Sequence, residues 1–319
     1  MSDSDRIIML PGLKKSLEQK MHACIEDKNY SEALSIANEL IEHDVQDINI
    51  NLIKLSCLTE LNRLEDAVSF IEDLLQKQNK HYYSYFEIYL GLLYETEQYE
   101  EIMHTLDETE IPEASKPVFD DLYRIAFQTN EKLKLASAKE LISELEVVIN
   151  TKDNLKQWNL INQLRKLKVM PPNDIIRLLK LDIIHPVVKT AVFSWLNETQ
   201  YQDKVEIIKF DQNLSISPAK TENLTSHPVV KKTIFYLTRI EDENPSLYTM
   251  IEEMLIKYFY VNYPILPEES EAKQIAEALE ILCRQSLYGE INEEINNELK
   301  HYMKDIEKSY KVYFEVIES

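Results

Sequence analysis

The chain has 319 residues, of which 44% are hydrophobic, and a formal net charge of −21. Such a charge disfavours binding to nucleic acid or to an anionic membrane, because both need a cationic surface. The chain has only three glycines, too few for the phosphate loops and tight turns of a Rossmann fold, a P-loop enzyme or a β-barrel. Low glycine with abundant Leu, Ile, Glu and Lys predicts an all-α protein.

The three cysteines, Cys24, Cys57 and Cys283, lie far apart and form no CxxC pair. We expect small buried thiols in a reducing compartment. The apolar stretch IIMLPGL (7–13) is short and broken by Pro and Gly, so it does not resemble a signal peptide. No run approaches the roughly 20 apolar residues of a membrane span. A cytoplasmic location is therefore expected, with no membrane contact.

Residues 29–44 and 63–78 share one apolar pattern at a shift of 34 residues. Both copies place apolar side chains at the spacing of one helical face. The pairs are Ala33/Ala67, Leu34/Val68, Ile36/Phe70, Ala37/Ile71, Leu40/Leu74 and Ile41/Leu75. A third copy at 98–108 keeps the pattern as far as Leu106. Each copy follows another predicted helix, over 13–26, 48–61 and 82–96, so the unit is helix, turn, helix.

This unit resembles the tetratricopeptide repeat (TPR), which has the same period. Leu90, Gly91 and Tyr94 match the Leu-Gly-x-x-Tyr element of the family, and Ala33 and Ala67 match the small residue at its helix crossing. The usual Trp and the closing Pro are absent. The resemblance implies a right-handed superhelix over 1–150, with a fourth helix pair at 117–129 and 132–150. It also implies a concave groove that holds a protein or peptide.

Carrying over the inner positions of the family gives the candidate groove residues. They are Lys20, Lys54, Cys57, Glu60, Tyr85, Tyr89 and Glu95. Some TPR domains clamp a C-terminal carboxylate, but Phe86 and Leu90 stand where that clamp needs cations. We therefore expect no such clamp. Two interpretations of the tyrosine-rich segment 81–99 stay open, plain packing or an interface.

The composition changes near residue 150, so 151–319 is predicted to form a second, helical domain. Residues 152–189 hold eight basic and three acidic residues, whereas 95–113 hold eight acidic residues and no Lys or Arg. We interpret Arg165, Lys166 and Lys168 as a basic patch. It would dock an acidic protein surface, or the acidic end of a second copy in a homodimer.

The second domain contains one phrase twice, HPVVKTAVF from His185 and HPVVKKTIF from His227. Proline suits the first turn of a helix, so each phrase predicts a helix start with His at the cap. A metal-binding histidine pair is the less favoured interpretation. The repetition resembles one helix of a HEAT-like unit. Between the copies, KVEIIKF and LSIS flank Asp-Gln-Asn and predict a small β-hairpin near 204–217. Helices are expected at 245–263, 269–287 and 290–317.

A search for phosphate loops, HExxH, GxSxG and EF-hand motifs finds none. We therefore predict a non-enzymatic scaffold or adaptor, without cofactor or metal, that binds a protein or peptide partner. The chain resembles TPR proteins of low-GC Gram-positive bacteria. Two alternatives stay open. One is a peptide-responsive regulatory receptor, which the start of the repeats near Leu13 disfavours. The other is an enzyme with an unrecognised site in the C-terminal half.

Overall fold

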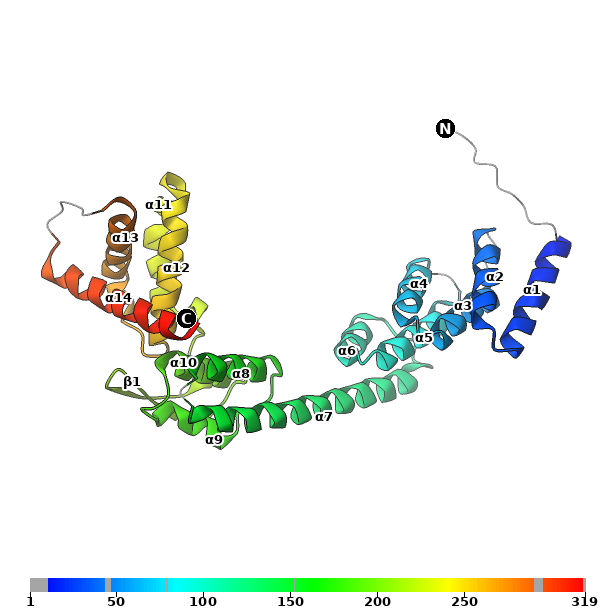
Figure 1. The fold of residues 1–319 in the computed structure, drawn as a ribbon, viewed down its shortest axis with the longest axis horizontal. Coiled ribbons are helices and arrows are strands. Elements are labelled where there is room, and N and C mark those ends of the chain that lie inside the picture. The colour runs from blue at the N-terminus through cyan, green and yellow to red at the C-terminus, as the bar shows by residue number, and fades with distance from the viewer. Residues whose placement is uncertain (1–10, 44–46, 79, 152, 290–294, 318–319) are drawn as a thin grey trace. The chain divides into compact units, whose positions relative to one another are not determined.

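The structure is a computed structural model that describes residues 11–43, 47–78, 80–151, 153–289 and 295–317 (Figure 1). Over these residues the chain forms fourteen α-helices and one two-stranded antiparallel sheet. The predicted all-α fold with one small hairpin is therefore confirmed. The chain divides into two compact units, Met1–Lys132 and Leu133–Ser319. The division falls inside one helix, whereas residue 150, the predicted boundary, lies just beyond the end of that helix.

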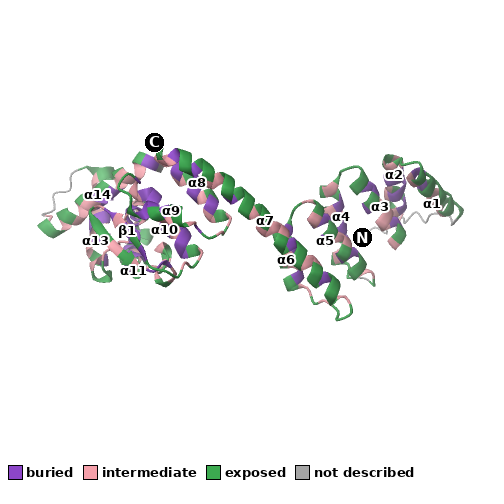
Figure 2. Ribbon diagram, turned by 90° about the horizontal axis from the view of Figure 1, so that it is seen from below, coloured by how far each residue is buried: buried purple, intermediate pink, exposed green. Residues whose placement is uncertain are grey.

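The first unit contains three consecutive helix pairs. They are α1 (Pro11–Glu26) with α2 (Tyr30–Glu42), α3 (Ile48–Glu60) with α4 (Leu64–Gln76), and α5 (Tyr82–Glu95) with α6 (Tyr99–Glu108). Ala33, Ala67 and Ile102, which the repeat makes equivalent, are all 0% exposed. Figure 2 shows the buried residues on the sides where these helices face one another. The three predicted helix–turn–helix units are thus present, with the two alanines and Ile102 in the core.

One backbone turn joins the two helices of each pair. Lys28, Asn62 and Glu97 occupy equivalent places and have φ of 57°, 55° and 58°. The next residue donates its N–H to the carbonyl five residues earlier, as in Asn29 to Cys24 at 2.7 Å and Gln98 to Leu93 at 2.8 Å. This is the Schellman pattern of a helix end, which normally takes glycine at the left-handed position. The chain therefore repeats its turn by hydrogen bonding, without glycine.

Replacing Glu97 with Gly should stabilise the first unit by about 0.5–1 kcal/mol. Gly removes the cost of about 1–2 kcal/mol that the left-handed conformation imposes on a residue with a side chain. Part of this gain is lost, because Gly gives the unfolded chain more conformational entropy. Glu97→Ala is the matched control, since it removes the same charge but keeps Cβ. Thermal unfolding followed by circular dichroism measures the difference. Equal melting temperatures for the Gly and Ala variants would contradict the turn assignment.

The predicted fourth helix pair is wrong. Residues 116–149 form a single helix, α7 (Lys116–Ile149), without a break near 129–132. That segment, Thr-Asn-Glu-Lys, contains neither Pro nor Gly, so nothing in it ends a helix. Phe119 and Ala126 of α7 pack in a core of the first unit, and Ala138 and Leu145 pack in a core of the second. The apolar side chains at 138–145 therefore pack in the core of the second unit and do not form a fourth repeat.

The second unit holds the C-terminal part of α7 and the remaining elements. They are α8 (Asn154–Lys166), α9 (Asn173–Ile176), α10 (Pro186–Glu198), β1 (Val205–Lys209), β2 (Gln212–Ile216), α11 (Pro228–Glu243), α12 (Pro245–Asn262), α13 (Ala272–Tyr288) and α14 (Asn297–Ile317). One core surrounds Trp195 and gathers α7, α8, α9, α10 and the hairpin. A second core surrounds Phe259 and gathers α11 to α14. The last helix, predicted over 290–317, is observed over Asn297–Ile317. Residues 290–294 lie outside the described part of the chain.

The hairpin pairs Val205 with Ile216 and Lys209 with Gln212. Its turn is Phe210-Asp211, with φ of 49° and 65°, and not the predicted Asp-Gln-Asn. Two positive φ values at the centre of a two-residue loop match the twist of the flanking strands. Gln212 is consequently the first residue of β2.

The doubled phrase marks two helix starts, as predicted. His185 precedes Pro186 of α10 and its Nδ1 accepts the Val187 N–H at 3.3 Å. His227 precedes α11, but its side chain makes no cap hydrogen bond. Burial lowers the pKa of both imidazoles. The phrase therefore begins a helix in both places.

Candidate partner-binding site

The seven predicted groove residues separate by exposure. Cys57 and Tyr85 are 0% and 1% exposed and belong to the core of the first unit. The Tyr85 hydroxyl accepts a hydrogen bond from Asn51 Nδ2 at 3.0 Å, which links α3 to α5. Neither Cys57 nor Tyr85 is open to a partner, so both leave the candidate set. Their removal has a physical reason: the first helices of neighbouring repeats pack on this side.

Lys20 lies on α1 and is exposed, with its Nζ 2.6 Å from Glu32 Oε1 of α2. The hydrogen bond to Glu32 raises the pKa of Lys20, and the same contact lowers the pKa of Glu32. The two charges compensate each other within one helix pair. The Lys20–Glu32 pair therefore adds little net charge to the candidate face.

Lys54 and Tyr89 both contact α4, from α3 and α5 respectively. The Lys54 ammonium lies 4.0 Å from the centre of the Phe70 ring. The Tyr89 hydroxyl donates to Glu72 Oε1 at 3.4 Å, and burial raises its pKa to about 12. Phe70 and Glu72 thus join the candidate site, although mapping only the first helices of the repeats did not include them. The sequence does contain one signal for this part of the site: the second copy has the aromatic residue Phe70 where the first copy has Ile36.

Three glutamates end the first helices of the three repeats. Glu26, Glu60 and Glu95 are the last residues of α1, α3 and α5, and all three are exposed. None has a Lys, Arg or His partner among the described residues. A helix C-terminus carries partial negative charge, so an acidic residue there costs about 0.3–1 kcal/mol. The three glutamates recur at intervals of 34 and 35 residues. The first unit therefore has three unneutralised carboxylates at equivalent places.

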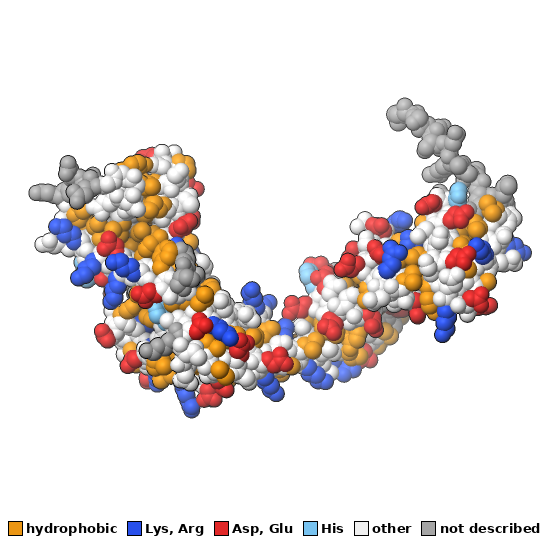
Figure 3. Space-filling view, viewed as in Figure 1, with side chains coloured by type: hydrophobic (Ala, Val, Ile, Leu, Met, Phe, Trp, Pro, Cys, Tyr) orange, Lys and Arg blue, Asp and Glu red, His pale blue; other side chains and the backbone are white. Residues whose placement is uncertain are grey.

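We call these three residues, with Lys54, Phe70, Glu72 and Tyr89, the first-unit face. Figure 3 shows acidic side chains spread over the visible side of α1 to α6. The face combines unpaired carboxylates with partly exposed aromatic rings. Such a surface suits extended chains that carry ammonium or guanidinium groups.

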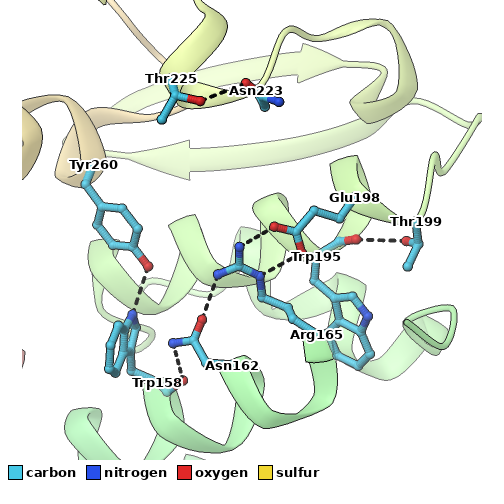
Figure 4. A network of polar contacts seen from close by, with 9 residues as sticks. All are labelled: Trp158, Asn162, Arg165, Trp195, Glu198, Thr199, Asn223, Thr225 and Tyr260. Atoms are coloured by element: carbon cyan, nitrogen blue, oxygen red, sulfur yellow. Dashed lines mark hydrogen bonds and ion pairs between the residues drawn. The ribbon is translucent and has the colours of Figure 1, made fainter. Parts of the chain in front are cut away.

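The predicted basic patch is smaller than expected. Arg165 donates from Nε to Glu198 Oε2 at 3.0 Å, from Nη2 to Glu198 Oε1, and from Nη1 to Asn162 Oδ1 at 2.6 Å (Figure 4). Beside it, Trp158 Nε1 donates to the Tyr260 hydroxyl at 2.8 Å. Arg165 therefore ties α8 to α10 in the second unit. Only Lys166 and Lys168 remain exposed.

The described residues contain no group of three or more His, Cys, Asp or Glu that could hold a metal ion. Within the same part of the chain, no helix has the length and apolar character needed to cross a bilayer.

Three helix pairs, a common turn and a fully buried residue at the equivalent place of each pair define a TPR-like helical-repeat protein. The chain is 29% identical over 284 residues to the TPR repeat-containing protein YsoA of Bacillus subtilis (strain 168). The match covers 86% of this chain and 84% of that relative. The predicted resemblance to TPR proteins of low-GC Gram-positive bacteria is therefore confirmed. No family model matches the chain, and no solved structure matches it.

Proposed function

We propose that this chain is a non-enzymatic cytoplasmic adaptor whose first unit holds a protein segment rich in Lys and Arg. The supporting observation is the row of Glu26, Glu60 and Glu95, exposed and without cationic partners at the ends of α1, α3 and α5. The helix dipoles add negative potential at the same three places. Tyr89 of α5 adds a partly exposed aromatic ring in the same unit.

The net charge of −21 supports the proposal by a second route. A strongly acidic chain attracts basic partners over a distance and speeds their association. The attraction between exposed charges is screened by salt, with a Debye length of about 8 Å at physiological ionic strength. A peptide-responsive receptor would use the same face, so one binding test serves both hypotheses.

The test replaces Glu26, Glu60 and Glu95 together with Gln. Binding of a fluorescent Lys-Ser peptide, measured by anisotropy, should weaken about tenfold, because each exposed charge contact contributes about 0.5 kcal/mol. The salt dependence of binding should also flatten. Removing acid from three helix C-termini should stabilise the first unit, so unfolding would not explain a loss of affinity.

The matched control replaces Glu65, Glu87 and Asp107 with Gln, Gln and Asn. These side chains are exposed in the same unit but do not end a first helix. The control removes the same charge and should leave affinity within about twofold, the range of a distant surface charge. Equal weakening in both triple variants would show general charge attraction and would overturn the proposed face.

A second copy of the chain offers one basic segment, residues 152–189, in which Lys166 and Lys168 are exposed. Sedimentation equilibrium decides whether that copy is the partner. A dimer that Lys166→Glu/Lys168→Glu weakens would assign the partner as a second copy. A monomer at all concentrations would assign a different basic protein.

A further inference from the structure

A cavity of about 360 Å³ lies in the second unit, apart from the first-unit face. Its walls come from the hairpin, the end of α12 with the following loop, and α14. Its polar lining includes Tyr258, Asn262, Glu271, Tyr302, Asp305 and Ser309. This volume falls within the range of small-ligand sites in proteins.

Tyr258 is the most informative residue of this cavity. The residue is 5% exposed, and its hydroxyl has no hydrogen-bond partner among the described residues but is open to the cavity that it lines. Burial, together with the nearby carboxylates Asp305 and Glu271, raises its pKa far above the ordinary value, so the hydroxyl stays protonated. A protonated hydroxyl that is open to a cavity and has no protein partner is available for a hydrogen bond with a bound ligand.

The two carboxylates of the cavity are not neutralised by Lys or Arg. Glu271 accepts the Tyr302 hydroxyl and the Glu268 N–H, both at 2.7 Å, and has no cationic partner among the described residues. Asp305 has His301 at 3.3 Å, which is charged only when protonated.

The two lysines of the cavity wall already contact other groups of the protein. The Lys209 ammonium donates to Thr190 Oγ1, Val261 O and Tyr263 O, which uses all its protons. Lys308 lies 4.9 Å from the centre of the ring of Phe210, which also lines the cavity, so the charge of Lys308 stays at the cavity wall against that ring.

The amide of Asn262 strengthens the acceptor character of the wall. Its Nδ2 donates to Tyr258 O at 2.8 Å and to Ser309 Oγ at 3.0 Å, which leaves Oδ1 as a free acceptor. The cavity therefore offers carboxylate, amide and phenol oxygens together with two tyrosine rings. Ile265, Leu266 and Pro267 supply an apolar wall.

We propose that this cavity binds a primary alkylammonium group. The ammonium would lie among Tyr258, Glu271 and Asp305, and its methylene chain would lie against the apolar wall. Carboxylates and aromatic faces are the groups that stabilise an ammonium in a protein. Two sources share this chemistry, a lysine side chain of a partner protein and a free aliphatic diamine. The proposal does not rest on the function proposed for the first unit.

The test is calorimetric titration of the full chain with 1,5-diaminopentane and with Nα-acetyl-lysine methylamide. Glu271→Gln should weaken binding about tenfold, since a hydrogen bond to a charged group is lost. Gln at this position keeps the contact with the Glu268 N–H that caps the following helical turn. Tyr258→Phe should weaken binding about threefold or more by removing one hydrogen bond. Tyr248→Phe is the matched control, because Tyr248 lies on the same helix outside the cavity.

The outcomes separate the two sources and the proposal itself. Tighter binding of the diamine assigns a free amine, and tighter binding of the lysine derivative assigns a protein partner. Absence of binding by both probes would overturn the proposal. So would equal binding of the neutral Nε-acetylated derivative, or unchanged affinity in Glu271→Gln and Tyr258→Phe. The fluorescence of Trp158 and Trp195, both in the second unit, reports whether a variant is folded. If a variant does not fold, Asp305→Asn takes its place in the test.

Discussion

Replacing Lys209 with Met should lower the free energy of unfolding of the second unit by about 2–4 kcal/mol. Lys209 is 3% exposed and donates to Thr190 Oγ1, Val261 O and Tyr263 O. These carbonyls lie at the C-terminal end of α12, where a cation is favoured. Burial, together with the nearby Lys189, lowers the pKa of the amine well below its ordinary value. Met fills the same space but leaves buried oxygens without donors.

Both tryptophans of the chain, Trp158 and Trp195, lie in the second unit, so tryptophan fluorescence follows its unfolding selectively. Lys180→Met is the matched control. Lys180 forms an ion pair at 2.6 Å with Glu206 of β1, the strand that also carries Lys209. Both side chains of this pair are about half exposed. Its loss should change stability by less than about 0.5 kcal/mol. Similar destabilisation by both variants would contradict the role given to Lys209.

Replacing Ala67 with Phe should destabilise the first unit by about 1–3 kcal/mol, because it overpacks a closed helix crossing. Ala67 and its equivalent Ala33 are both 0% exposed. The first unit has no tryptophan, so its transition should appear in circular dichroism while tryptophan fluorescence stays unchanged. Ala33→Phe should have a similar effect, because the repeat makes the two positions equivalent.

Ala23→Phe is the matched control for this second prediction. Ala23 lies on an exposed face of α1, so a phenyl group there has room. Its effect should stay within about 0.5 kcal/mol. An unchanged melting temperature for Ala67→Phe would show that the two alanines are not at helix crossings, and the repeat alignment would fail.

The helix pairs of the first unit could be predicted because their core is local. Ala33, Ala67 and Ile102 recur at the repeat period, and each packs within its own helix pair or the next. The turns could not be predicted from residue type, because Lys28 and Glu97 adopt the left-handed conformation without being glycine. Their geometry comes from hydrogen bonds back to the preceding helix, which repeat more faithfully than the residues.

The errors arise where a contact depends on distant parts of the chain. α7 continues through 129–132 because its ends pack in two different cores, which a local pattern does not reveal. Tyr85 is buried because it meets Asn51 of the preceding repeat. The same holds for the phrase repeated at His227: Phe193 is buried against Tyr263, whereas its counterpart Phe235 is 70% exposed.

The two candidate sites also differ in how far the sequence alone predicts them. Glu60 and Glu95 follow from the repeat alignment alone, since each lies one residue before the end of a predicted helix. The cavity does not, because it joins Lys209 of the hairpin, Tyr258 of α12 and Ser309 of α14. No spacing in the sequence predicts that these residues meet.

Carbodiimide cross-linking tests the central claim most directly, because it joins a carboxylate to a lysine amine only where they touch. The full chain is cross-linked to the Lys-Ser peptide and the modified carboxylates are located by mass spectrometry. We predict cross-links concentrated at Glu26, Glu60 and Glu95 and reduced by added salt. Cross-links spread evenly over the exposed carboxylates, including Glu65 and Glu87, would contradict a specific binding face on the first unit.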